Sequence, residues 1–549
     1  MPSPGSAARA PLLWLLLPFL AGLVAGQLWP QLPGSPRSFA LTGALLSLAA
    51  TALAWWRPSA PRWPWATLLV SGVMLTGLAA MRAQAPAPAS ADAVPREINV
   101  TVEVTQVFAA APKSKTLAGL GRVISTGAPA PALAGQLVYF SAIRKVSVPP
   151  LRSGRYAVRG LLQPLPPDRD SADFNDYLAN LGVRQRLMRA QIIREVRPPG
   201  ALPRFYAAAA ERLEQILAHG LERHPELLSV YLGMTLGEKA VLSTEQQNAF
   251  MRSGTFHIFS VSGLHVAAIA LALLGLLRLA RLPERAAVVV GLPVLWLYVQ
   301  ITGGSAPAVR AFLMIAFLSA ARVFRLPGNS LAALAGAALL TLLLDPRQLF
   351  STGFQMSYAV VAALVLMGAP LADKWLDAWR PFASLPKVSW QRWQRWTEAG
   401  GRKFLAALAA SWVAFLASTP SGIGYFELFS PGSLVANLLV IPLSSLALGA
   451  GFLSLLAGLC GLLPLSLLLN RAAALLILGM DWLVRHGTAL PGAYFPATFR
   501  AAWLAPAGLA VLLALMLYGR HVRWAPARGG FWPPVVFVGL LLIFGVKFG

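Results

Sequence analysis

The chain has 549 residues, of which 56% are hydrophobic and only 12% are charged, and its mean hydropathy is +0.61. Several apolar runs reach the ~20 residues that a helix needs to cross a bilayer, so a soluble globular protein is excluded and a polytopic membrane protein is predicted. The formal net charge is +25. Basic inner loops explain part of this excess, and the rest indicates a polyanionic partner, either lipid or nucleic acid.

Motifs for metals and cofactors are missing from the sequence. The single cysteine, Cys460, rules out a disulfide or a CxxC metal site within the chain. The 6 histidines form no HExxH or HxH pattern, and neither a Walker A motif nor a Rossmann glycine fingerprint is present. We therefore expect no metal site and no cofactor.

Three apolar runs open the chain, and they predict an N-terminal three-helix membrane segment over residues 1–82. The first run also fits a signal peptide, but two more runs follow it, so we interpret all three as spanning helices. Arg57 and Arg62 lie between the second and third runs, which places that loop and the N-terminus inside. The runs cover residues 11–29, 38–56 and 65–81.

A small β domain is predicted outside the membrane. A Pro/Ala linker covers residues 83–95, and residues 98–107 then alternate apolar and polar side chains, as a half-buried strand does. Short strands between Pro and Gly turns predict an OB-like barrel over residues 96–200. Further candidate strands are 121–125, 135–141 and 156–162.

This predicted domain is strongly basic, with 15 Lys and Arg against 7 Asp and Glu in residues 96–200. The positive-inside rule does not explain basic residues on the outer side. The excess favours a surface that binds a polyanion, or one that faces anionic headgroups. Arg152, Arg155 and Arg159 are our candidates for nucleic-acid contact, and the last two share one face of a strand.

The rest of the chain is predicted to be helical. Residues 201–253 hold amphipathic, interfacial helices, since apolar residues recur between 203 and 219 with a 3.6-residue period. Residues 254–549 form a multi-helix membrane domain, for a total of about eleven to thirteen crossings. Its apolar runs are 256–280, 286–302, 306–321, 329–344, 352–370, 404–420, 431–468, 470–486, 502–518 and 531–547.

Two of these regions need comment. The 431–468 run is too long for one crossing, so a re-entrant piece is expected there. The basic loop 371–403 lies inside and interleaves tryptophans with arginines, which fits either base stacking with single-stranded nucleic acid or an amphipathic helix at the headgroups. These residues are Trp390, Arg392, Trp393, Arg395 and Trp396.

Polar side chains at membrane depth mark the candidate site. Such residues are costly in lipid and face a protein interior or a water-filled path, and Gly and Pro near them break helices that line such paths. Ordinary helix packing by small polar residues is the alternative. The candidates for the path or its gate are His257, Ser260, Ser262, His265, Arg310, Gln355, Ser357 and Asn437.

Catalysis is not expected at these residues. The serines at 260 and 262 are not in a nucleophile elbow, and no nearby Asp or Glu orients either histidine. The sequence therefore predicts a polytopic α-helical membrane protein with an inserted small all-β (OB-like) extracytoplasmic domain, and no enzyme.

Several segments resemble the ComEC competence family of DNA-uptake channels, in the family's order. Residues 256–266 resemble its HLLAVSGLHV signature, 236–242 its LGDRSGL element and 305–314 its S.P..RAFLM helix. The segments Asp345-Pro, Gly353-Phe-Gln-Met-Ser357 and Asn437-Leu-Leu-Val-Ile-Pro442 complete the set. Residues 173–182 resemble the FDY..YL...G close of the family's OB-like domain.

The resemblance implies an inner-membrane channel that passes single-stranded DNA into the cytoplasm during natural transformation. The implied partners are single-stranded DNA, membrane lipid and separate competence proteins, namely a DNA receptor, a cytosolic motor and a nuclease. No HxHxDH pattern of the family's metallo-β-lactamase-like domain is present, so we expect a short form without nuclease activity. A small-molecule or lipid transporter and a non-conducting scaffold of a DNA-uptake complex remain open.

Overall fold

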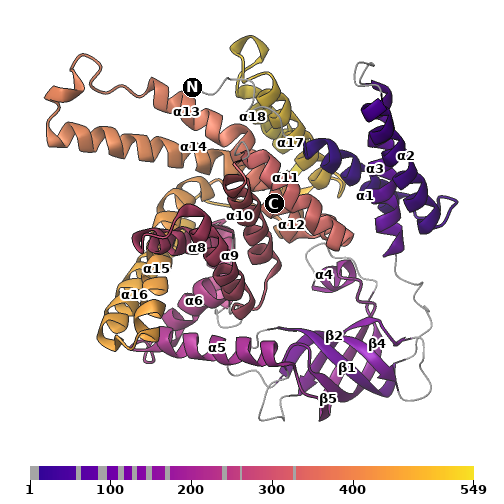
Figure 1. The fold of residues 1–549 in the computed structure, drawn as a ribbon. Helices are drawn as coiled ribbons and strands as arrows, with labels where there is room; N and C mark the ends of the chain where they lie inside the picture. The colour runs from indigo at the N-terminus through magenta and orange to yellow at the C-terminus, as the bar shows by residue number, and fades with distance from the viewer. Residues whose placement is uncertain are drawn as a thin grey trace.

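The computed structural model describes residues 11–56, 63–84, 95–108, 116–126, 133–143, 151–166, 174–237, 244–259, 263–325 and 329–549. In these ranges the protein is a helical membrane body with one small closed β-barrel (Figure 1). The barrel is inserted after the third helix, and a long helix leads from it back into the body (Figure 1). The predicted fold class is confirmed.

Three helices precede the barrel: α1 (Leu13–Leu28), α2 (Pro36–Trp56) and α3 (Trp63–Ala83). α1 crosses α3 closely because Gly22 has no side chain, and a Cβ there would lie 1.9 Å from the Met74 carbonyl oxygen. Small residues at such contacts are typical of membrane helix pairs. α1 also packs on the membrane body, where Phe19 and Leu23 share a buried cluster with Leu342.

The barrel has five strands in the order β1-β2-β3-β5-β4. β3 and β5 pair in parallel, whereas the other pairs are antiparallel. α4 (Phe174–Asn180) lies between β4 and β5, and alternate strand residues fill one apolar core. The strands are β1 (Arg96–Phe108), β2 (Thr116–Thr126), β3 (Leu137–Ile143), β4 (Arg155–Pro164) and β5 (Gln185–Arg197).

β5 was not among the predicted strands, for a physical reason. Three register shifts against β4 break its alternation, and its second half from Ile193 is exposed. Only Leu187 and Ala190 are fully buried in the barrel core. A period-2 pattern in sequence does not survive such bulges.

Helices α5 (Ala201–Ala218), α6 (Pro225–Leu236) and α7 (Thr244–Arg252) join the barrel to the body. The membrane body follows. Its helices are α8 (Gly263–Leu279), α9 (Glu284–Ile301), α10 (Ala306–Val323), α11 (Ser330–Leu344), α12 (Thr352–Ala363), α13 (Ala369–Ala378), α14 (Arg392–Phe426), α15 (Ser433–Leu459), α16 (Leu463–Ala489), α17 (Leu504–His521) and α18 (Trp532–Leu540). Short strands β6 (Leu428–Phe429), β7 (Phe495–Phe499) and β8 (Val546–Phe548) form a small sheet beside them.

Within the described residues, 10 helical segments are long and apolar enough to cross a membrane, and α1, α8 and α11 are shorter apolar helices. The α13–α14 hairpin projects away from the end of the body that carries the barrel (Figure 1). This arrangement is that of a multi-pass membrane protein.

Two expectations about the spans were wrong in detail. The 256–280 run is not one helix, because a 3-10 turn, η3 (Phe256–Phe259), precedes α8. The 431–468 run has no re-entrant piece, since α15 continues through Pro442 for 27 residues. The chain then reverses at Gly461, whose φ of +77° suits a helix-ending glycine.

Candidate functional site

The polar segment, described at residues 254–259 and 263–265, packs against other helices at both of its ends. Gly254 adopts a φ of +71°, and a Cβ there would lie 2.6 Å from the Ser433 Cβ at the start of α15. At its other end, a Cβ on Gly263 would lie 3.7 Å from the Ala311 Cβ of α10. The turn therefore joins α8, α10 and α15.

The two histidines of this turn have different surroundings. His257 lies in η3 and is exposed, whereas His265 lies in the first turn of α8 and is 0% exposed. The protein around His257 lowers its pKa by desolvation, and a backbone hydrogen bond with Gly254 opposes this effect. Ser260 and Ser262 lie outside the described residues.

Arg310 carries a charge into the interior of the body. Its side chain is only 2% exposed, and its Nη2 donates a hydrogen bond of 2.8 Å to the carbonyl oxygen of Gly353. Its Nε has no partner, and no carboxylate of the described residues forms an ion pair with it. A buried charge without a counter-charge is strongly unfavourable in a low dielectric.

Gln355 also holds the beginning of α12. Its Nε2 donates to the Leu349 carbonyl (3.1 Å), and its Oε1 accepts from the Tyr425 hydroxyl of α14 (2.8 Å). The Ser351 hydroxyl caps the same helix by accepting from the Phe354 amide (3.2 Å). Arg310 of α10 and Tyr425 of α14 thus both bind the first turn of α12, at Gly353 and at Gln355.

Ser357 and Asn437 are half-buried, on α12 and α15. The Oδ1 atom of Asn437 is buried and has no hydrogen-bond partner among the described residues. Asn437 lies one turn beyond Ser433, which touches Gly254. The path candidates among the described residues therefore lie on neighbouring helices, but they do not form one contiguous cluster.

The barrel arginines differ from one another in their partners. Arg155 Nε lies 2.8 Å from Glu103 Oε2, and Arg159 Nε lies 2.8 Å from Glu97 Oε1. Exposed pairs of this kind contribute little to stability and exchange readily with other anions. Arg152 instead reaches the membrane body, because a Cβ on Gly304 would lie 3.4 Å from its Nη1.

Cross-strand register builds a basic row that the sequence did not reveal. Glu103 of β1 pairs with Arg122 of β2 on one side and with Arg155 of β4 on the other. Arg155 in turn pairs with Arg197 of β5. Three arginines and one glutamate therefore follow each other across the outer face of four strands. We call this set the arginine row.

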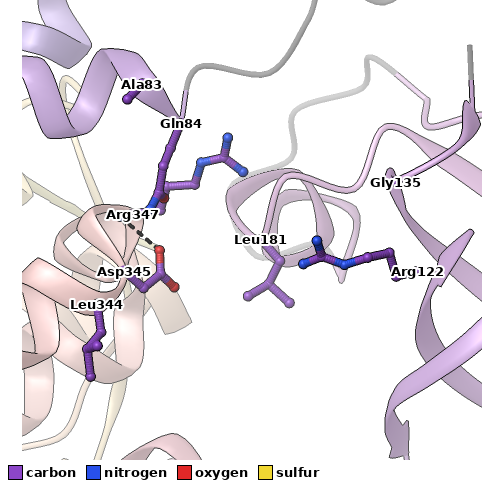
Figure 2. Close-up of a pocket in the computed structure, with 8 residues that line it drawn as sticks. All are labelled: Ala83, Gln84, Arg122, Gly135, Leu181, Leu344, Asp345 and Arg347. Carbon is purple, nitrogen blue, oxygen red and sulfur yellow. Dashed lines mark hydrogen bonds between the residues drawn. The ribbon is translucent and has the colours of Figure 1, made fainter. Parts of the chain in front are cut away.

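A cavity of about 570 Å³ lies where the barrel meets the membrane body. We call it the junction pocket; its wall includes Gln84 after α3, Arg122 and Leu181 of the barrel, and Asp345 and Arg347 of the body. Figure 2 shows Arg122 and Arg347 projecting into this space from opposite sides. Sequence reasoning missed this site, since its walls come from three distant parts of the chain.

The Arg347 side chain also forms the contact between barrel and body. It extends from the 3-10 turn η4 (Pro346–Phe350) to Gly182, where a Cβ would lie 1.9 Å from its Nη1. Burial is the largest effect and lowers the pKa of Arg347; the Asp345 carboxylate opposes it, and the smaller effect of Arg184 lowers the pKa as well. Arg347 is therefore partly desolvated, with a carboxylate and a second arginine close to it.

No group of three or more His, Cys, Asp or Glu side chains in the described ranges converges in a way that suits a metal ion. The polar chemistry of these sites is instead that of arginine, amide and hydroxyl groups. Such groups bind anions and direct hydrogen bonds.

Comparison with known proteins identifies one family. The family model described as "Competence protein" matches residues 234–522, from α6 to the end of α17. ComE operon protein 3 of Bacillus subtilis (strain 168) is 31% identical over 143 residues, which are 26% of this chain and 18% of that protein. The uncharacterized protein YcaI of Escherichia coli (strain K12) is 28% identical over 222 residues, 39% of this chain and 27% of that protein. No solved structure matches the chain.

Proposed function

We propose a function from one premise: the chain belongs to the competence protein family, whose model covers just over half of its length. On this premise the protein takes part in DNA uptake. It forms a channel in the cytoplasmic membrane that passes single-stranded DNA into the cytoplasm. A separate DNA receptor, a cytosolic motor and a nuclease would deliver the DNA, pull one strand and remove the other.

The buried charge of Arg310 is the observation that carries this proposal. Arg310 lies within the matched region, about 6 Å from the beginning of α10 at a rise of ~1.5 Å per residue. No described carboxylate neutralises it. A passing phosphate would supply the missing negative charge, and a DNA strand brings one such charge per nucleotide.

The orientation that we propose follows from charges and contacts. The barrel touches η4 through Arg347 and the 302–305 loop through Arg152, so these parts share one end of the body. The α13–α14 hairpin, with Lys387, Arg392 and Arg395, lies toward the opposite end (Figure 1). The positive-inside rule then puts the hairpin in the cytoplasm and the barrel outside.

Complementation of a gene-deletion strain tests the channel. We expect Arg310→Ala to reduce uptake of labelled DNA by about tenfold or more, the effect of losing ~1.4 kcal/mol of interaction with the strand. Arg322→Ala, an exposed arginine at the other end of α10, is the matched control and should behave as wild type. Protein level in the membrane is measured for each variant.

The proposal fails if deletion of the whole gene leaves DNA uptake unchanged. It also fails if Arg310→Ala protein is present at the wild-type level and supports wild-type uptake. Strand passage into vesicles that contain the purified protein would distinguish a channel from a non-conducting scaffold.

A further inference from the structure

The junction pocket has the size and position of a ligand site. Its volume of about 570 Å³ lies within the range of ~300–1,000 Å³ that is typical of small-ligand clefts. One wall belongs to the barrel, and the other to the turn between α11 and α12. A ligand here would touch both parts of the molecule.

The charges around the junction pocket favour an anion. Arg122 and Arg347 face it from opposite sides (Figure 2), and Arg184 lies close enough to disfavour the charged form of Arg347. Asp345 is the one carboxylate of the wall. Each of these guanidinium groups can donate hydrogen bonds to the oxygens of a phosphate group.

The carboxylate of Asp345 is occupied within its own turn. Its Oδ1 accepts from the Arg347 amide (3.2 Å), and its Oδ2 accepts from Gln348 Nε2 (3.0 Å). These bonds cap η4. The bond between Asp345 and the Arg347 amide is drawn in Figure 2. Asp345 supplies one negative charge to a wall that carries two arginines, Arg122 and Arg347, so the wall keeps a net positive charge.

The junction pocket adjoins the arginine row of the barrel on one side and the segment that binds the buried Arg310 on the other. Arg122 is the end of the arginine row on the barrel and also part of the pocket wall. On the side of the body, η4 leads within a few residues to Gly353, whose carbonyl holds Arg310.

We propose that the junction pocket binds a phosphodiester group of single-stranded DNA between Arg122 and Arg347, and so transfers the strand from the barrel to the membrane body. This inference rests on the proposed function and assigns its receiving site. The phosphate of an anionic lipid has the same chemistry, and the experiment below separates the two sources.

The experiment uses the full chain in nanodiscs of phosphatidylcholine with a fluorescent oligothymidylate. Arg122→Gln and Arg347→Gln should each weaken binding at low salt several-fold and reduce the slope of log affinity against log salt by about 0.7, the value for one phosphate contact of a single strand. Arg122→Lys and Arg347→Lys keep the charge and should retain the slope. Arg322→Gln, far from the junction pocket, is the control for net charge.

A further variant carries Arg122→Gln and Arg347→Gln together. If its affinity for oligothymidylate and its salt slope equal those of the wild type, the inference is overturned. A loss of phosphatidylglycerol bound to the protein, measured by native mass spectrometry, with oligothymidylate binding intact would also overturn it; that result assigns the pocket to lipid. Either result leaves the proposed function standing if Arg310→Ala still blocks uptake. By contrast, normal uptake in the deletion strain would remove the proposed function itself.

Discussion

Single glycines decide how closely the polar turn and the barrel approach the helices. Gly254 needs its left-handed φ of +71° and also leaves room for Ser433. Gly182 has a φ of +82° and leaves room for Arg347. Both positions therefore combine a backbone requirement with a contact, and the two effects can be separated by experiment.

For the turn, we expect Gly254→Ala to destabilise the protein by about 2 kcal/mol or more, because it adds left-handed strain and a clash with α15. Gly275→Ala in α8 is the matched control, since a Cβ there meets nothing within 4 Å and alanine favours a helix. Thermal unfolding in detergent measures both. Equal unfolding temperatures for the two variants would contradict the clamped turn.

For the barrel contact, Gly182→Ala and Gly135→Ala are compared. Both glycines have a φ near +80°, but a Cβ on Gly135 meets nothing within 4 Å. Both substitutions cost about 1 kcal/mol of backbone strain, while only Gly182→Ala also displaces Arg347. Hydrogen exchange in residues 345–353 should therefore rise only in Gly182→Ala. A similar rise in both variants would show that the contact does not order η4.

At the scale of elements, one buried network holds the helix that follows the barrel. Asn470 of α16 accepts from the Tyr231 hydroxyl (3.1 Å) and donates to the carbonyls of Ile216 (2.8 Å) and His219 (3.1 Å). The Ser454 hydroxyl of α15 donates to the same amide oxygen at 2.6 Å. All of these groups lie in the helical body, so the network fixes the end of α5.

We expect Asn470→Ala to destabilise the protein by about 3 kcal/mol, because it leaves several buried polar groups without partners. Ser445→Ala is the control, since that hydroxyl only donates to Ile441 of its own helix. Chemical unfolding followed by tryptophan fluorescence compares them. If the two variants unfold at nearly the same denaturant concentration, water takes the place of the Asn470 amide in the network.

On the outer face of the barrel, removing a negative charge is expected to strengthen DNA binding, whereas removing an arginine is expected to weaken it. Glu103 pairs with Arg155 and lies beside Arg122 in the arginine row, so it competes with phosphate for both. We expect Glu103→Gln to strengthen oligothymidylate binding by the full chain roughly twofold to tenfold at low salt. Binding that weakens instead would show that Glu103 holds Arg155 in the conformation that contacts DNA.

At the scale of the whole molecule, the single cysteine tests the orientation. Cys460 is exposed at the turn between α15 and α16. With the barrel outside, and with one crossing each for α8, α9, α10, α11, α12–α13, α14 and α15, this turn lies in the cytoplasm. A membrane-impermeant maleimide should therefore label Cys460 in inverted vesicles but not in intact spheroplasts. Labelling in the opposite preparation would reverse the whole topology, including the side of the barrel.

Local patterns in the sequence were sufficient for much of this fold. The apolar runs located the spanning helices, because the ~20-residue length of a crossing is a property of each segment. Four of the five barrel strands and the helix from Ala201 to Ala218 also followed from their periodicity. The polar residues at membrane depth were identified from the free-energy cost of placing a polar side chain in lipid, which applies at any position in a spanning helix.

Only the tertiary structure decided how these segments meet. The bulged β5, the unbroken α15 and the arginine row depend on register and packing, which composition does not encode. The junction pocket requires Arg122 and Arg347 to face each other across two parts of the chain. The sequence by itself determined that Arg310 enters the membrane body. That it does so without a described carboxylate partner, and against Gly353, depends on which helices surround it.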